Sequence, residues 1–193
     1  MATSPQSSPE FRRPGREDAL QLARLEFLAG NRVDMQVLAE QLGIARGTLY
    51  RWVSSREHVL DELLGQIAGE TFRAVCDATG GRGLDRIAAA SRTAMELFVA
   101  LEPLRTFITR EPQLAVSLLM SEAGGVHREL AAVLRDMLNV EGAKSGPELE
   151  DRINVVVHIA TSLIWVSYAV GDEPRIERTT NVIRELLRDV VPR

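Results

Sequence analysis

One short segment carries side chains suited to contact nucleic acid, spaced as on a short helix. Arg46, Thr48 and Arg51 share this segment with Gly47 and Tyr50. An arginine can donate two parallel hydrogen bonds to guanine, a hydroxyl can bond to a base or a phosphate, and glycine lets the backbone approach closely. The set therefore predicts contacts in the major groove of DNA. The alternative is an ordinary helical corner whose polar face meets only water.

The residues around these side chains predict a helix-turn-helix. A helix is expected near 34–42 with Asp34 as its N-cap, and a turn at Gly43 leads into a second helix near 46–52. Because Ala45 has no side-chain oxygen, we expect the second helix to be about 1 kcal/mol weaker than one capped by serine. The core shared by the two helices is expected to contain Leu38, Leu42, Ile44 and Leu49.

Helical periodicity dominates the rest of the chain, and no strand-like alternation persists. A first helix is expected near 15–30, and Ser54 with Glu57 predicts a capping box at the start of a helix that ends near Asp77. Further helices are expected near 84–101, 103–110, 112–122, 125–140, 147–171 and 173–190. The sequence therefore predicts an all-α protein of about nine helices.

Composition sets limits on function. The 193 residues carry a net charge of −4, which argues against a protein that coats nucleic acid with its whole surface. Residues 1–60 nevertheless hold eight arginines against seven acidic residues, so a local basic patch is compatible with the sequence. The single cysteine, Cys76, excludes a disulfide framework and suits a reducing cytoplasm.

Motifs for catalysis or for a protein metal site are missing from the sequence. There is no H-E-x-x-H, no phosphate-binding loop and no G-x-S-x-G. The three histidines, His58, His127 and His158, lie far apart in the chain. We therefore expect neither an enzyme nor a metal or other cofactor.

Residues 44–52, followed by Ser55-Arg56-Glu57 and an apolar helix, closely resemble the TetR family of bacterial repressors, and the likeness covers about residues 16–64. It implies a three-helix helix-turn-helix head and a helical body for ligand binding and dimerisation. The DNA contacts that it implies are Arg46, Gly47, Thr48, Tyr50, Arg51 and Arg56. Asp34 departs from the threonine often found nearby in the family, and we expect it to act as a cap.

The resemblance also implies a division of the chain. The domains expected are a disordered tail at 1–14, a DNA-binding domain at 15–56, a connecting helix and loop at 57–83, and a ligand-binding and dimerisation domain at 84–193. Residues 103–115 look like the regulatory domain of the QsdR-type subgroup, and residues 50–57 agree with it. That likeness implies an effector of lactone or acyl type and a cytoplasmic repressor that binds a palindromic duplex operator.

Apolar and aromatic side chains of the body include candidates for a ligand pocket. They are Met95, Phe98, Phe107, Met120, His158, Thr161, Trp165 and Tyr168. Together they combine an apolar wall with a few polar groups, as small-molecule sites do. The alternative for each one is an ordinary core residue. His158 and Thr161 lie within one turn of each other and are the best candidates for polar anchors.

The helices near 147–171 and 173–190 are expected to form a homodimer, because the first is apolar on nearly every side and a monomer has too few neighbours to enclose it. The uncharged run 153–170 just reaches the length that spans a bilayer, but polar residues interrupt it, so a buried helix is favoured over a membrane anchor.

A different class of function remains open at this point. It is a helical dimer that sequesters small apolar molecules without binding DNA.

Overall fold

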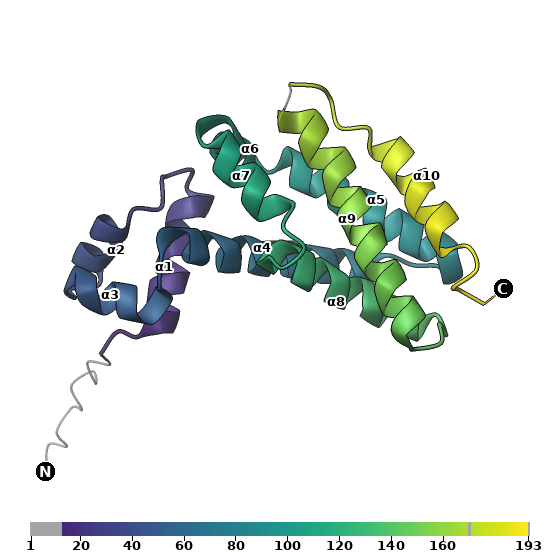
Figure 1. The fold of residues 1–193 in the computed structure, drawn as a ribbon, viewed down its shortest axis with the longest axis horizontal. Coiled ribbons are helices and arrows are strands. Elements are labelled where there is room, and N and C mark those ends of the chain that lie inside the picture. Colours follow the sequence, from purple (N-terminus) through teal and green to yellow (C-terminus); the bar gives the residue numbers. More distant parts are fainter. Residues whose placement is uncertain (1–12, 170, 193) are drawn as a thin grey trace, which may run out of the picture.

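The computed structural model describes residues 13–169 and 171–192, and these form ten helices without a strand (Figure 1). They are α1 (Arg16–Leu28), α2 (Met35–Gln41), α3 (Arg46–Val53), α4 (Arg56–Ala78), α5 (Gly83–Ala100), α6 (Glu102–Arg110), α7 (Pro112–Leu119), α8 (Gly125–Val140), α9 (Pro147–Ala169) and α10 (Ile176–Leu187). The all-α fold is confirmed, and each of the ten ranges expected from the sequence holds one of these helices. Most of the tail expected at 1–14 lies outside the described residues.

Most helix boundaries follow the predicted turn residues. Gly30 and Gly43 follow α1 and α2 with φ angles of +77° and +66°, a conformation that costs glycine little. Prolines start α7 and α9 and stand in the first turn of α6, because a residue there needs no backbone N–H donor. Two helices end a few residues earlier than expected. The expected ends were near 122 and 190, whereas α7 ends at Leu119 and α10 at Leu187.

The capping box predicted at Ser54 is wrong by one residue. Ser54 instead ends α3 with a positive φ of 65°, and Ser55 is the N-cap of α4. The hydroxyl of Ser55 accepts a hydrogen bond from the backbone N–H of His58 at 3.1 Å. Two adjacent serines made the cap ambiguous in sequence, and the tight reversal between α3 and α4 assigns it to the second.

Helices α1, α2 and α3 form a small N-terminal head (Figure 1). Leu38 and Leu49 are 1% and 0% exposed at its centre, while Leu42 and Ile44 are half-buried against the same core. The predicted shared core of the helix-turn-helix is therefore confirmed. Outside the head, α5 to α10 form a larger body.

The long helix α4 joins the head to the body (Figure 1). Its 23 residues span about 34 Å at the usual rise per residue. Two ion pairs fix α1 along it: Arg16 with Glu62 and Arg24 with Glu70. The head and the first half of α4 are thus bonded to each other along much of α1.

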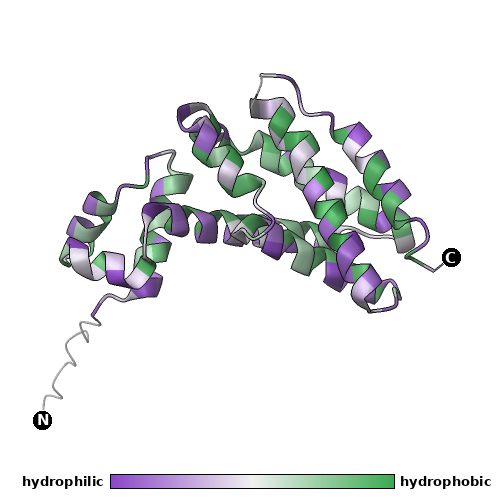
Figure 2. Cartoon of the chain, in the orientation of Figure 1, coloured by the Kyte–Doolittle hydropathy of each residue, from purple (hydrophilic) through white to green (hydrophobic). Residues whose placement is uncertain are grey.

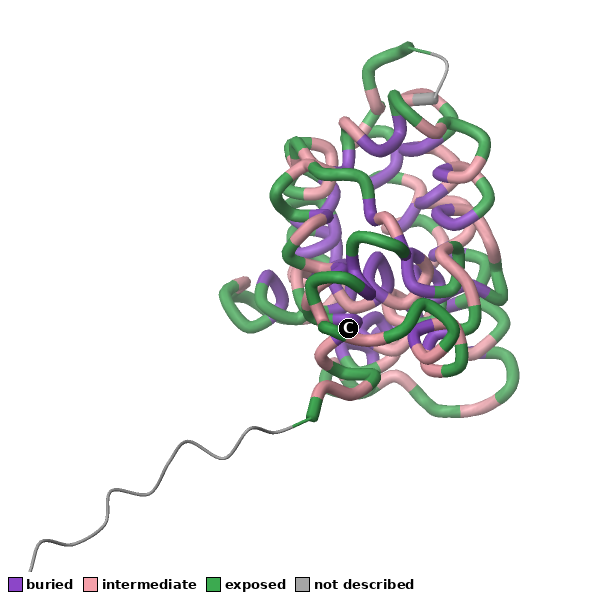
Figure 3. The backbone as a smooth tube through the Cα atoms, turned by 90° about the vertical axis from the view of Figure 1, so that its left-hand side faces the viewer, coloured by how far each residue is buried: buried purple, intermediate pink, exposed green. Residues whose placement is uncertain are grey.

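In the body, α4 packs most extensively against α8, and α5, α9 and α10 complete the bundle. Buried segments face inward and exposed segments outward (Figure 3). Cys76 of α4 is buried with its Sγ 3.0 Å from Sδ of Met137, and burial raises the pKa of this thiol to about 11.

Hydrophobic and hydrophilic residues are mixed along the body helices (Figure 2). Among the described residues, none of the helices is long and apolar enough to cross a bilayer. The uncharged run 153–170 is the one whose length just suffices to span a bilayer. It contributes Ile153, Val156 and Trp165 to the core, where they are 0%, 2% and 6% exposed.

Candidate nucleic-acid interface and internal cavity

Helix α3 has one face fixed in the head and one face open to solvent. Leu49 and Val53, four residues apart, are 0% and 1% exposed. On the other face Arg46, Gly47 and Arg51 are exposed, while Thr48 and Tyr50 are half-buried. The structure therefore brings five of the six predicted DNA-contacting residues onto one short helix.

The polar side chains of α3 are paired with one another. Arg46 donates from Nη2 to the hydroxyl of Tyr50 at 3.2 Å, and its guanidinium carbon lies 5.3 Å from the centre of that ring. The hydrogen bond to Tyr50 raises the pKa of Arg46 above its ordinary value. Arg51 donates from Nη2 to Oγ1 of Thr48 at 3.1 Å. Two cations are thus held by neighbours on the same helix.

The start of each helix in the helix-turn-helix follows the sequence prediction. Asp34 Oδ1 accepts hydrogen bonds from the backbone N–H groups of Gln36 and Val37 at 2.7 and 3.3 Å, and these bonds lower the pKa of the carboxyl. Asp34 is therefore confirmed as a cap. Ala45 is the N-cap of α3 and gives it no side-chain hydrogen bond.

Arg56 is the first residue of α4, as the resemblance implied, but its side chain is bonded within the protein. Its Nε donates to the carbonyl of Val33 at 2.6 Å, and its two terminal nitrogens donate to the carboxylate of Glu111 at 2.8 and 2.6 Å. The side chain is only 15% exposed. The guanidinium is thus engaged within the protein by a residue 55 positions away, and its contact with phosphate stays a prediction.

The body holds a partly open cavity of about 70 Å³ between α4, α5, α8, α9 and α10. Four predicted pocket residues, Met95, Phe98, Thr161 and Trp165, line it. The remaining lining residues are Phe72, Ser91, Ala94, Leu130, Leu134, Val156, Val157, Ala160 and Ile183. The hydroxyl of Thr161 donates within its own helix to the carbonyls of Val157 and His158 at 2.9 and 3.0 Å. No charged side chain lines this cavity.

The other four predicted pocket residues lie elsewhere. Phe107 packs edge-on against Phe27 of the head, with ring centres 5.9 Å apart, and Met120 is half-buried at the end of α7. His158 Nδ1 lies 3.2 Å from Oε1 of Glu122, although it makes no hydrogen bond there. Tyr168 accepts a hydrogen bond from Nε of Arg105 at 2.7 Å. The chemistry of these four side chains suited a ligand pocket. Helical spacing alone, however, did not show which other helix each side chain would pack against.

Several residues that line the cavity were not predicted from the sequence. Ser91 and Ala94 share one face of α5 with Met95 and Phe98, and this run of small and apolar residues at helical spacing was the available signal. Phe72 and Leu130 come from α4 and α8, and no local pattern connects them with α5.

No group of three histidine, cysteine or acidic side chains in the described ranges is placed to hold a metal ion. His127, which follows the glycine pair 124–125 and stands two residues before Glu129, is buried with Nε2 3.1 Å from Oδ1 of Asn154. Its environment is that of a hydrogen-bonded core residue.

Comparisons with known proteins agree with this arrangement. The family model "Tetracyclin repressor-like, C-terminal domain" matches residues 82–188, which is more than half of the chain. The chain belongs to the TetR family. No curated protein matches significantly.

Solved TetR-family structures resemble this chain. The transcriptional repressor QsdR of R. erythropolis aligns with a TM-score of 0.82 and 26% sequence identity, over 92% of this chain and 96% of that one. A tetR-family transcription regulator from Shewanella sp. PV-4 aligns with a TM-score of 0.45 and 16% identity, over 94% of this chain and all of that one. The likeness to QsdR therefore extends over head and body together.

Proposed function

We propose that this protein is a ligand-responsive transcriptional repressor that binds a palindromic DNA operator as a homodimer and is released by a small apolar effector. The observation that carries the proposal is the solvent-facing side of α3, where Arg46 and Arg51 are exposed while Leu49 and Val53 anchor the helix in the head. Membership of the TetR family and the likeness to the repressor QsdR support it.

On this proposal α3 enters the major groove. Arg46 and Arg51 donate hydrogen bonds to bases, Thr48 and Tyr50 contact bases or phosphates, and Gly47 lets the backbone come close. A side chain added at Gly47 would meet no atom within 4 Å of the protein, so the space there is free for DNA. Binding that rests on arginine–phosphate contacts weakens steeply with salt.

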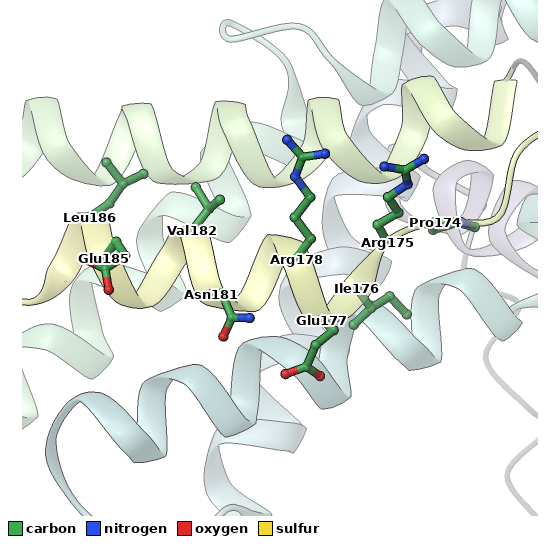
Figure 4. Close-up of a pocket in the computed structure, with 9 residues that line it drawn as sticks. All are labelled: Pro174, Arg175, Ile176, Glu177, Arg178, Asn181, Val182, Glu185 and Leu186. Carbon is green, nitrogen blue, oxygen red and sulfur yellow. The ribbon is translucent and has the colours of Figure 1, made fainter.

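The outer faces of α9 and α10 support a homodimer. Val155 and Val166 of α9 are each 46% exposed, which is unusual for large apolar side chains on an otherwise well-buried helix. An open groove of about 850 Å³ runs along α10, and Figure 4 shows Arg178, Val182 and Leu186 extending from that helix. A two-fold axis through this face would bury the apolar residues and place two heads on successive half-sites.

The cavity between α4, α5, α8, α9 and α10 supports an uncharged effector. Its walls are apolar apart from Ser91 and Thr161, and an ionised ligand group there would have no partner of opposite charge. Since the cavity holds only about 70 Å³, an effector of drug size must displace side chains to enter. A neutral molecule with an apolar chain, such as an acylated lactone, suits these walls.

The deciding experiment is selection of genomic duplex fragments with the purified protein, followed by titration of the recovered sequence. Arg46→Ala and Arg51→Ala should each weaken binding by about 5- to 150-fold, the value of one arginine–base contact. Arg128→Ala is the matched control, because it removes the same charge from an exposed position on α8 of the body. It should change affinity little.

Two outcomes would contradict the proposal. One is a flat titration against every recovered duplex at low salt, which would favour a protein that sequesters apolar molecules without DNA. The other is an equal loss of affinity in Arg128→Ala, which would mean that binding depends on net charge alone.

A further inference from the structure

One buried hydroxyl of the body differs from the other buried polar groups in having no hydrogen-bond partner. The buried polar side chains of the described part of the chain are Ser91, His127, Thr161, Thr179 and Thr180. His127 is bonded to Asn154, and each of the three threonines donates to the carbonyl four residues back in its own helix. Ser91 is only 7% exposed, yet its hydroxyl makes no hydrogen bond to any described residue.

The Ser91 hydroxyl faces a place where a ligand could reach it. A serine inside a helix can bond to the carbonyl four residues back, which for Ser91 belongs to Ile87, but this bond is not made. Among the described residues, the fully enclosed polar side-chain atom without a partner is Nδ1 of His158, so the oxygen of Ser91 is not sealed by protein atoms. Because Ser91 lines the partly open 70 Å³ cavity, its hydroxyl is free to bond with a molecule there. An unpaired hydroxyl in an apolar wall otherwise costs stability.

The walls of this cavity offer hydrogen-bond donors. Besides Ser91, the indole of Trp165 is a donor that makes no hydrogen bond to a described residue. The third polar wall residue, Thr161, already uses its proton on the carbonyls of Val157 and His158. A carbonyl oxygen accepts hydrogen bonds and needs no acceptor in return, so it suits this set of side chains.

The rest of the lining suits an apolar tail. Phe98, Leu130 and Trp165 line both this cavity and a second one of about 30 Å³. The second cavity is lined by apolar and aromatic residues alone, with no hydroxyl and no charged side chain. A chain of methylene groups that extends from one cavity toward the other would therefore contact apolar atoms and leave water along its length.

We infer that Ser91 is the residue that recognises the effector, and that its hydroxyl donates a hydrogen bond to a carbonyl oxygen of a neutral molecule with an apolar tail. The inference rests on the proposed function and specifies the chemical class of the effector. Ser91 fixes the polar end of the molecule, while Phe98 and Leu130 contact the tail. Since a hydrocarbon of the same shape gives the hydroxyl no partner, the protein prefers the carbonyl compound.

The test compares two neutral ligands of the same shape on the full-length protein without DNA. They are methyl hexyl ketone and the alkene in which a methylene group replaces its carbonyl oxygen. Titration calorimetry measures the affinity of each ligand for wild type, Ser91→Ala and Ser117→Ala. Ser117→Ala is the matched control, because Ser117 of α7 does not line the cavity and its hydroxyl donates to the carbonyl of Leu114 at 2.9 Å.

The expected results separate recognition from a structural role. Ser91→Ala should weaken binding of the ketone about 5- to 150-fold, the effect of leaving one buried acceptor without a donor. It should bind the alkene at least as tightly as wild type does, and Ser117→Ala should bind both ligands like wild type. In the ligand-free protein the melting temperature of Ser91→Ala should equal or exceed that of wild type, because the hydroxyl has no bond to lose and alanine is the better helix former. A lower melting temperature would assign Ser91 a structural role instead.

Three binding results would also overturn the inference. They are an equal loss of both ligands in Ser91→Ala, a ketone affinity that falls in Trp165→Phe but not in Ser91→Ala, and no binding of the ketone by wild type. None of these bears on operator binding, which the duplex titration tests separately. Should Ser91→Ala fail to fold, Ser91→Cys, whose S–H is a weaker donor, must show the same selective loss of the ketone, or the inference is rejected.

Discussion

The close crossing of α4 and α8 makes Gly65→Ala a quantitative test of this fold. A Cβ at Gly65 would lie 2.7 Å from the carbonyl carbon of Gly125 and 2.8 Å from its oxygen. Ordinary van der Waals contact begins at 3.4 Å, so the two helices would have to separate by several tenths of an ångström. Gly125 cannot yield easily, because its N–H bonds to Oδ1 of Asp61 at 2.9 Å.

The cost follows from two opposing effects. Overpacking a well-packed contact costs about 1–3 kcal/mol, whereas replacing glycine by alanine inside a helix gains about 1 kcal/mol. Because the clash is with backbone rather than with a movable side chain, we take the upper end of the cost, a net loss of about 2 kcal/mol. For a chain of this length that corresponds to a fall in melting temperature of about 4–8 °C.

The assay is thermal unfolding followed by circular dichroism at one fixed protein concentration. Gly47→Ala is the matched control, since a Cβ there meets nothing within 4 Å and alanine favours the helix. It should keep or slightly raise the melting temperature, while operator affinity falls as the added methyl group obstructs the DNA backbone. A melting temperature of Gly65→Ala at or above that of wild type would refute the packing argument.

Three further predictions concern other parts of the chain. Asp34→Ala should lower the free energy of unfolding by about 1 kcal/mol at pH 7. Because folding lowers the pKa of Asp34, this loss should be fully present above the unfolded pKa of about 4 and should disappear at pH values below the folded pKa. Urea unfolding at a series of pH values measures this. Cys76 should react with iodoacetamide at pH 8 more than about a hundredfold slower than free cysteine, because its pKa is about 11 and it is buried; fast labelling of native protein would contradict this. Val155→Glu and Val166→Glu should shift the protein toward monomer in sedimentation experiments, whereas Val140→Glu, at a position 75% exposed near the end of α8, should not.

Local signals in the sequence predicted most of the fold. The glycines after α1 and α2, the prolines at the starts of α6, α7 and α9, and the cap at Asp34 act within a few residues of their position. The solvent-facing side of α3 followed from the same periodicity, because burial of Leu49 and Val53 fixes where the intervening residues point.

Long-range contacts limited what the sequence predicted of the candidate site. Arg56 was expected to contact phosphate. In the structure it pairs with Glu111, which is 55 positions away in the chain, and no local pattern indicates this pairing. In the same way Phe107 was assigned to the pocket and instead packs against Phe27. His158 and Thr161 were both expected to be polar anchors on their helix, and of the two only Thr161 lines the cavity.

The shielded thiol of Cys76 has a practical consequence for work on this molecule. The natural chain offers no accessible sulfhydryl in the residues that the structure describes, so a cysteine introduced on the surface would carry a spin label or a fluorophore selectively. One such label on α2 and another on α8 would report the distance between the two halves of the protein directly in solution. The native sequence would need no prior substitution.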